Sequence, residues 1–350
     1  MMAKAGIKAH IAVLPSPGIG HVTPLLELSK LLASQHECDV SFLNVTTECS
    51  AAQKQLLQSP NLPSNIQVID IPAVDLSSIV NDETPVLTRL CLNLRESLRP
   101  LNAILSQLPH KPQAMIIDMF GTQVFDSIPD NIPVFTFFTA SAHLLAFSLF
   151  LPQLDRDVQG EFVDLPNPVQ SRPHVNSHFT QHVARSGTPH KALAEHPFYR
   201  SINTPPLYLV GPLIKESEPV KENEQEECLA WLDKQPAGSV LFVTFGSGGV
   251  LSWEQQIELA WGLELSGVRF LWVVRAPNEA NASAAFFKTG GDDAKETWMN
   301  GATVEEELGV GVRVRVNRGG GLLPRDDIER VVRMVMDGEE GKQMKLEPQS

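Results

Sequence analysis

The chain has 350 residues, enough for about two domains of roughly 150 residues each. It carries 28 lysine and arginine residues against 41 aspartate and glutamate residues, so its net charge at pH 7 is −13. Such an acidic chain would repel a phosphate backbone or an anionic lipid surface, which argues against nucleic-acid and membrane-surface roles. Hydrophobic residues make up 43% and charged residues 20%, which is typical of a globular protein and excludes collagens, coiled coils and disordered chains.

The cysteines and the N-terminus predict a cytoplasmic protein. The four cysteines are scattered, with no C-x-x-C pair and no dense framework, which indicates reduced thiols. The N-terminus has too short an apolar run for the core of a signal peptide. The uncharged stretch 132–153 contains several polar residues and changes period midway. A buried strand followed by a core helix fits this stretch better than a membrane span.

The first 150 residues alternate between strand and helix patterns. Thr23 is expected to cap a helix that has Pro24 at its first position, and an apolar stripe from Val86 to Leu108 predicts a long amphipathic helix. Strands are predicted at 9–15, 39–45, 66–72, 114–118 and 134–138. Repeated βα units of this kind build a parallel sheet with helices on both faces, so a doubly wound domain is expected.

The pattern is lost over 159–206, which is rich in proline and histidine. His174, His178 and His182 are spaced by four, as metal ligands on a helix would be. Because no carboxylate flanks them and helix propensity is weak, a solvated loop is the preferred interpretation.

Order returns in the second half of the chain. Strands are predicted at 238–245, 268–274 and 311–316, and helices at 252–265 and from 324 to about 336. Ser252 and Gln255 are spaced as a capping box at the start of the first of these helices. Three strands with so few helices would leave apolar surface exposed to solvent. This half of the chain is therefore either covered by the first domain or a partner, or incomplete.

Two residues follow strands at the edge of the first predicted sheet where doubly wound folds bind ligands. His21 ends the turn PSPGIGH, and Asp118 ends the strand at 114–118. A carboxylate at Asp118 could bond one ring nitrogen of His21 and leave the other as a base. An exposed turn histidine and a helix-capping aspartate are the alternatives. Thr23 stands where a third glycine would complete a dinucleotide fingerprint, so only the βα alternation favours a nicotinamide-dependent enzyme.

A glycine-rich loop lies between the strand at 238–245 and the helix that follows it. It comprises Gly246, Ser247, Gly248 and Gly249. Backbone N–H groups and the helix dipole would favour a phosphate group there. No lysine follows the glycines, so this is not a Walker loop, and a tight turn without a ligand is the alternative.

Taken together, these motifs resemble the plant UDP-sugar-dependent glycosyltransferases of small molecules, family 1, and most of all the branch that glucosylates phenols such as hydroquinone. The segments that carry the resemblance are 15–32, 114–126, 137–155, 228–278 and 307–342. It implies a GT-B fold of two doubly wound, Rossmann-like domains. The expected boundaries are 1–205 for an acceptor-binding domain, 206–227 for a linker and 228–350 for a truncated UDP-sugar-binding domain.

The resemblance also implies a reaction and a set of roles. The reaction is inverting transfer of a sugar, expected to be glucose, from a UDP-sugar to a hydroxyl of a small phenolic acceptor. His21 would be the catalytic base, needed because a phenol has a pKa near 10, and Asp118 would orient it. The expected donor-binding residues are Gly20, Thr139, Gly246, Ser247, Gly248 and Gly249. The UDP-sugar is a co-substrate, and a monomer without metal, further cofactor, nucleic acid or membrane insertion is expected.

The sequence departs from this family in its C-terminal half. The family's donor box contains H-C-G-W-N-S and an acidic residue followed by glutamine. This chain has no histidine after His196 and no glutamine between Gln256 and Gln343, so the box is absent. A second gap falls near 190–206. Losing several polar donor contacts predicts much weaker donor affinity, and the alternative is an inactive remnant or splice product that binds only a small aromatic acceptor.

Overall fold

The computed structural model describes residues 8–81, 84–128, 132–157, 193–211, 213–214, 227–246, 251–274, 311–312 and 322–346. The chain divides into two compact units, which we describe separately. Unit 1 comprises Met1–Val80 and Leu87–Lys215, and unit 2 comprises Asn81–Val86 and Glu216–Ser350. The boundary between Lys215 and Glu216 lies inside the segment 206–227 that was expected as a linker. The assignment of 81–86 to unit 2 was not expected.

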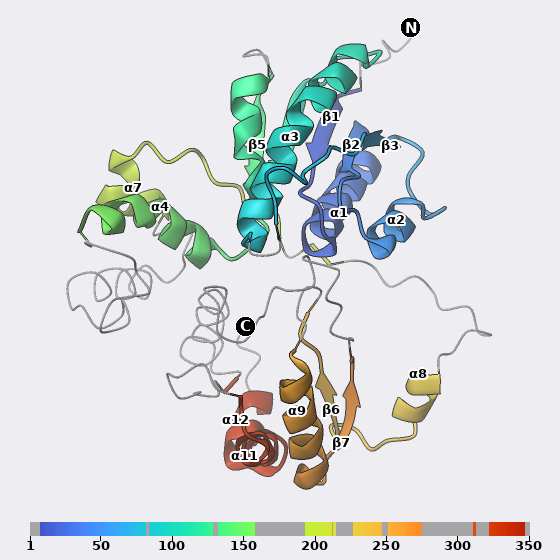
Figure 1. Ribbon diagram of the computed structural model, residues 1–350, viewed down its shortest axis with the longest axis vertical. Coiled ribbons are helices and arrows are strands. Elements are labelled where there is room, and N and C mark those ends of the chain that lie inside the picture. The colour runs from blue at the N-terminus through green and yellow to red at the C-terminus, as the bar shows by residue number, and fades with distance from the viewer. Residues whose placement is uncertain are drawn as a thin grey trace, which may run out of the picture. The chain divides into compact units, whose positions relative to one another are not determined.

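Unit 1 is built on a five-stranded parallel sheet (Figure 1). Its strands are β1 (His10–Leu14), β2 (Asp39–Val45), β3 (Ile66–Ile71), β4 (Ala114–Asp118) and β5 (Val134–Phe137). They follow the order β3-β2-β1-β4-β5, so the sheet grows outward in both directions from β1. All five strands agree with the sequence prediction to within one residue at each end. The gap between the carboxyl ends of β1 and β4 is the switch point at which doubly wound folds bind ligands.

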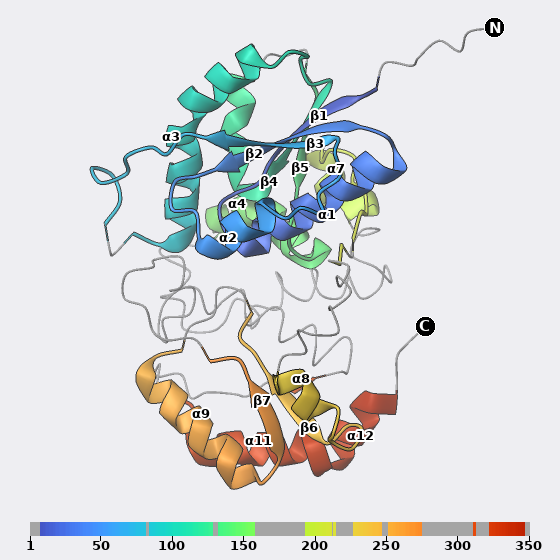
Figure 2. The same cartoon turned by 90° about the vertical axis from the view of Figure 1, so that its right-hand side faces the viewer.

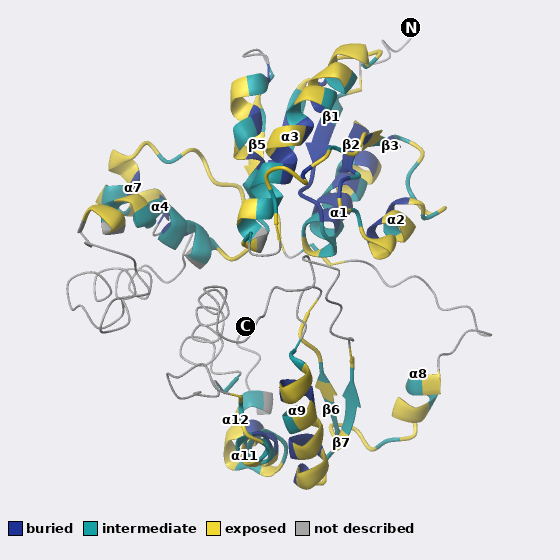
Figure 3. Ribbon diagram, in the orientation of Figure 1, coloured by how far each residue is buried: buried dark blue, intermediate teal, exposed yellow. Residues whose placement is uncertain are grey.

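Helices cover both faces of this sheet. The helices of unit 1 are α1 (Ile19–Gln35), α2 (Ala51–Leu57), α3 (Val86–Gln107), the 3-10 helix η1 (Met119–Ser127), α4 (Ala142–Asp157) and α7 (Pro197–Ser201), of which α4 and α7 pack against each other in a separate cluster. Figure 2 shows α1 and α2 on one side of the sheet and α3 on the other. Neighbouring residues of β1 accordingly enter different cores: Val13 packs with α1 and α2, whereas Leu14 packs with α3 and η1. Figure 3 shows that burial is concentrated in the central strands.

Helix α1 begins earlier than the sequence predicted. Its first residue is Ile19 rather than Pro24, and Gly18 is its N-cap. The backbone N–H groups of His21 and Val22 donate to the carbonyl of Gly18 at 3.1 and 2.9 Å, so a first turn forms ahead of the proline. Pro24 therefore lies inside the helix, where it lacks the N–H that would bond to Gly20. The correction places His21 in the first turn of a helix and not in a loop.

The described part of unit 2 is a pair of parallel strands with helices packed against it. Its elements are α8 (Glu227–Leu232), β6 (Val240–Val243), α9 (Trp253–Ser266), β7 (Arg269–Trp272), α11 (Arg325–Asp337) and α12 (Glu339–Leu346). Leu263 of α9 and Ile328 of α11 are buried together, with Leu241 and Val243 packed against them. Phe242 alternates to the opposite face and is 60% exposed. The strand predicted at 311–316 lies mostly outside the described residues.

Only half of the predicted capping box forms at the start of α9. The hydroxyl of Ser252 accepts a hydrogen bond from the backbone N–H of Gln255 at 3.2 Å. The side chain of Gln255 does not return to Ser252, because its amide pairs with the backbone of Leu323 at 2.7 and 3.1 Å. Gln255 thus fastens the segment before α11 to α9, which a local capping pattern could not reveal.

Candidate active site

His21 is carried by the segment that joins β1 to α1. The chain leaves β1 at Leu14 and passes through Ser16 and Gly18 before the helix begins at Ile19. Gly18 has φ of 117° and ψ of 140°, a left-handed conformation that only glycine adopts without strain. The turn brings the imidazole of His21 to the switch-point edge of the sheet, with 18% of its side chain exposed.

The structure brings His21 and Asp118 together. Nδ1 of His21 lies 3.0 Å from Oδ1 of Asp118, the last residue of β4. Asp118 is completely buried. A carboxylate can only accept hydrogen bonds, so the contact places a proton on Nδ1 and leaves the lone pair on Nε2. The ring of Phe120 packs edge-on against the imidazole, with centroids 5.2 Å apart.

Ser16 is a partner of Asp118 that the sequence analysis did not identify. Its hydroxyl donates to Oδ2 of Asp118 at 2.5 Å, and it is as fully buried as the carboxylate. The backbone N–H of Phe120 also donates to Oδ2, at 3.4 Å, so Asp118 caps η1 while it holds His21. The two interpretations proposed for Asp118 are therefore compatible. The position of Ser16 just after β1 was the available signal, because the carboxyl ends of β1 and β4 share one edge.

Thr139 follows β5 at the same edge of the sheet. Its Oγ1 lies 3.2 Å from Nδ1 of His21 and 3.5 Å from the sulfur of Met119. If Nδ1–H is shared between Asp118 and Thr139, the threonine oxygen accepts and its own proton points to Met119. The described geometry thus makes Thr139 a neighbour of the imidazole. Its expected contact with a donor sugar stays a prediction.

The remaining donor-site predictions are only partly covered by the described residues. Gly20 is exposed in the first turn of α1. Gly246 belongs to unit 2 and has φ of 69°, with no atom within 4 Å of the position a Cβ would take. Ser247, Gly248 and Gly249 lie outside the described residues, as do His174, His178 and His182.

A cavity of about 740 Å³ lies at the other edge of the unit 1 sheet. It is lined by residues at or near the amino ends of the strands, including His10, Asp39, Gln67 and Gln113. His21, Asp118 and Thr139 follow the carboxyl ends, so this cavity is separate from the candidate active site.

No helix in the described ranges is both long and apolar enough to cross a membrane. In the same part of the chain, no group of three or more histidine, cysteine, aspartate or glutamate side chains is arranged to hold a metal ion.

The geometry can be compared with known proteins. No protein-family model matches the chain. Anthocyanidin 3-O-glucosyltransferase 5 from Manihot esculenta is 30% identical, with 97% of this chain and 89% of that protein covered. Hydroquinone glucosyltransferase from Rauvolfia serpentina is 35% identical, with 79% and 65% covered. The structure of Phytolacca americana UGT2 complexed with UDP-2fluoro-glucose and pterostilbene is 31% identical with a TM-score of 0.75, and 99% of this chain and 93% of that one are covered.

The chain belongs to the plant UDP-dependent glycosyltransferases that act on small molecules, family 1, and has their GT-B fold. This confirms the resemblance predicted from the sequence motifs and the expected pair of Rossmann-like domains. The alignment with the Manihot esculenta protein runs over 437 positions, which exceeds the 350 residues of this chain. The relative therefore has segments to which nothing in this chain corresponds.

Proposed function

We propose that this chain transfers glucose from UDP-glucose to a hydroxyl group of a small phenolic acceptor. The contact of 3.0 Å between His21 and the buried Asp118 is the observation that carries the proposal. It supplies an oriented base at the ligand-binding edge of a doubly wound sheet. The names of the relatives support glucose as the sugar and a hydroquinone-like phenol as the acceptor.

In the proposed reaction, Nε2 of His21 takes the proton of the acceptor hydroxyl. The acceptor oxygen forms a bond to C1 of the sugar while the bond between C1 and the diphosphate oxygen breaks, so C1 is inverted. UDP leaves with the bonding electron pair. Asp118 stabilises the imidazolium that forms, and Thr139 and Gly20 lie at the edge where the sugar would be held. The loop 246–249 would contact the diphosphate through backbone N–H groups.

The test is a glucosylation assay with UDP-glucose and hydroquinone, in which product is measured by mass spectrometry. We expect product from the wild-type chain and a rate at least about 100-fold lower for His21→Ala, as is typical when a general base is removed. An equal rate in this variant would rule out His21 as the base. Calorimetric titration with UDP provides a measurement that needs no choice of acceptor.

The missing donor box favours a second candidate, a protein that binds a small aromatic acceptor without turning it over. No histidine follows His196 and no glutamine lies between Gln256 and Gln343, so the donor contacts that this box makes in the family have no counterpart in this sequence. Binding of hydroquinone together with no heat of binding from millimolar UDP would support this candidate. Micromolar affinity for UDP would support the transferase.

Three further expectations belong to the proposal. UDP-glucose is expected to act as a co-substrate without a metal or other cofactor, and assays with and without a chelator test this. The monomeric state is tested by sedimentation. A cytoplasmic location is supported by the scattered cysteines, and imaging of a fluorescent fusion tests it.

A further inference from the structure

A row of buried side-chain amides connects β3 to the turn that carries His21. The backbone N–H of Gly18 donates to Oε1 of Gln53 at 3.0 Å. Nε2 of Gln53 donates to Oδ1 of Asn44 at 2.8 Å, and Nδ2 of Asn44 donates to Oδ1 of Asp70 at 2.7 Å. Every link donates in the same direction, toward the carboxylate, so the bonds polarise one another.

The charge of Asp70 determines how both amides are oriented. A carboxylate only accepts hydrogen bonds, so Asn44 must present its NH₂ group to Asp70 and its oxygen to Gln53. Gln53 must then present its NH₂ group to Asn44 and its oxygen to Gly18. Gln53 is 1% exposed and Asn44 is 4% exposed, so water does not compete for these groups.

Gly18 links this row of hydrogen bonds to the backbone of His21. Its N–H is held by Gln53, while its carbonyl accepts the N–H groups of His21 and Val22. Gly18 has a φ of 117°, a conformation that favours glycine. Gln53 therefore holds the peptide that leads into Gly18, the residue whose carbonyl starts α1 and bonds the backbone of His21.

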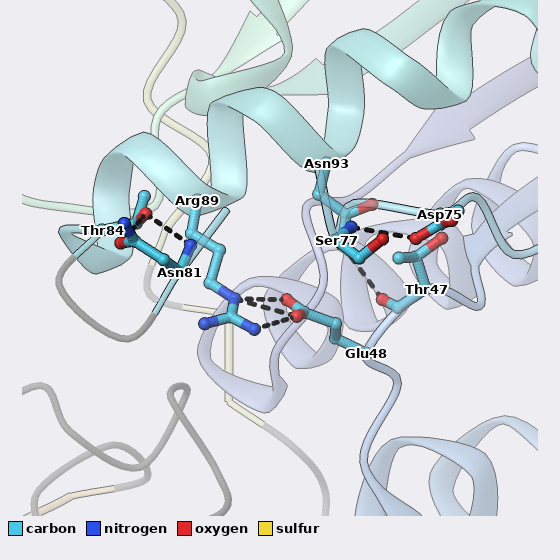
Figure 4. Close-up of polar contacts among 8 residues, drawn as sticks. All are labelled: Thr47, Glu48, Asp75, Ser77, Asn81, Thr84, Arg89 and Asn93. Carbon is cyan, nitrogen blue, oxygen red and sulfur yellow. Dashed lines mark hydrogen bonds and ion pairs between the residues drawn. The ribbon is translucent and has the colours of Figure 1, made fainter. Parts of the chain in front are cut away.

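Gln53 is itself firmly placed. Its backbone N–H donates to the hydroxyl of Ser50, the N-cap of α2, at 3.1 Å. The loop that leads into α2 is tied to α3, as Figure 4 shows: Arg89 forms an ion pair with Glu48, and Nδ2 of Asn93 donates to the carbonyl of Thr47 at 3.1 Å. These bonds tie the start of α2, and with it Gln53, to α3.

We propose that Gln53 is a positioning residue for His21, which acts by holding the N–H of Gly18. The proposal rests on the proposed function in taking His21 as the base. It concerns a residue that lies outside the predicted site and touches neither His21 nor Asp118 in the hydrogen bonds described.

The test compares Gln53→Met, which keeps the length of the side chain but removes both hydrogen bonds, with Gln55→Met on the exposed face of the same helix. The imidazole resonances of His21 are followed in protein labelled with ¹⁵N-histidine, together with the amide resonance of Gly18. We expect Gln53→Met to shift the Gly18 amide, to change the ¹⁵N shifts of the His21 ring and to lower kcat about 10- to 100-fold at constant KM. Gln55→Met should match the wild type in all three.

Unchanged His21 resonances in a folded Gln53→Met protein would overturn the proposal. Should that variant not fold, Asp70→Ala at an exposed residue supplies a second route, because it removes the oxygen that accepts from Nδ2 of Asn44 and orients the amides. A smaller shift of the His21 ring in the same direction is expected, and no shift would also overturn the proposal. The spectra need no turnover, so a His21 response without any transfer activity would reject the proposed function and keep the positioning role.

Discussion

Nδ1 of His21 lies 3.0 Å from Oδ1 of Asp118, although 97 positions separate the two residues in the sequence. The contact follows from the pairing of β1 with β4, in which Leu14 lies beside Ile117. Both strands end at the same edge, so a side chain just beyond β1 meets the last side chain of β4. The strand order of the sheet is therefore what creates the pair.

Replacing Asp118 by asparagine should abolish most of the transfer proposed for this chain. The asparagine NH₂ group can donate to Nδ1, which moves the imidazole proton to Nε2 and removes the base. We expect the glucosylation rate to fall about 100- to 10,000-fold, the range attributed to general-base catalysis. A rate within a factor of three of the wild type would show that the pair does not act in this way.

Replacing Ser16 by alanine should destabilise unit 1. It removes the donor that lies 2.5 Å from Oδ2 of Asp118 and leaves a buried carboxylate with one fewer hydrogen bond. We expect a loss of about 1–3 kcal/mol, measured by hydrogen exchange of the amides of β1 and β4. Ser106→Ala, at an exposed serine of α3, is the control and should leave these rates nearly unchanged.

Replacing Gly262 by alanine should destabilise unit 2. A Cβ at this position would lie 2.5 Å from Cβ of Ile328 and 2.9 Å from the carbonyl oxygen of Arg325. Overpacking costs about 1–3 kcal/mol, which exceeds the gain of roughly 0.5–1 kcal/mol in helix propensity. All five tryptophans lie within residues 216–350, so urea unfolding followed by tryptophan fluorescence reports on this unit. Glu264→Ala on the same helix is the control. If Gly262→Ala had the same free energy of unfolding as this control, the expected clash would be contradicted.

The ion pair between α9 and α11 should make unit 2 sensitive to acid. The pKa of Glu258 is lowered from 4.5, first because the Arg325 side chain donates hydrogen bonds to it and second because the Arg325 backbone N–H does. A carboxyl group with a lowered pKa contributes stability above pH 4.5, and this contribution is lost as the pH falls through the folded-state value.

Replacing Glu258 by glutamine should therefore lower the stability of unit 2 at pH 7, and the difference from the wild type should shrink below pH 4.5. Urea unfolding at several pH values measures it. Glu329→Gln, in an exposed pair with Arg333 on α11, is the control. A difference that stays constant between pH 7 and pH 3 would mean that Glu258 does not titrate as expected.

The sequence predicted the sheet of unit 1 well, because each strand is a short apolar run bounded by turn residues. It placed His21 and Asp118 at one edge for the same reason. The predicted start of α1 was wrong. Pro24 after Thr23 is a strong local signal for the first turn of a helix. In the structure an earlier turn forms through hydrogen bonds to the carbonyl of Gly18, and these depend on the conformation of that glycine, which the sequence pattern does not reveal.

Ser16 and Gln53 were missed for a different reason. A serine between two prolines and a glutamine in a short polar helix carry no pattern of their own. Their roles come from partners 102 and 35 positions away, which only the fold brings close. The side chain of Gln255 is a similar case, because its amide bonds to Leu323 rather than completing the local cap.

Among the described residues, the groups that position His21 belong to unit 1: Asp118 and Thr139 lie against its imidazole, Ser16 bonds Asp118, and Gln53 bonds the N–H of Gly18. The described contacts that orient the imidazole are thus all made within one unit. None of these described contacts involves a residue of unit 2. A chimera that joins the donor-binding unit of a longer relative after Lys215 would therefore retain each of these contacts around His21.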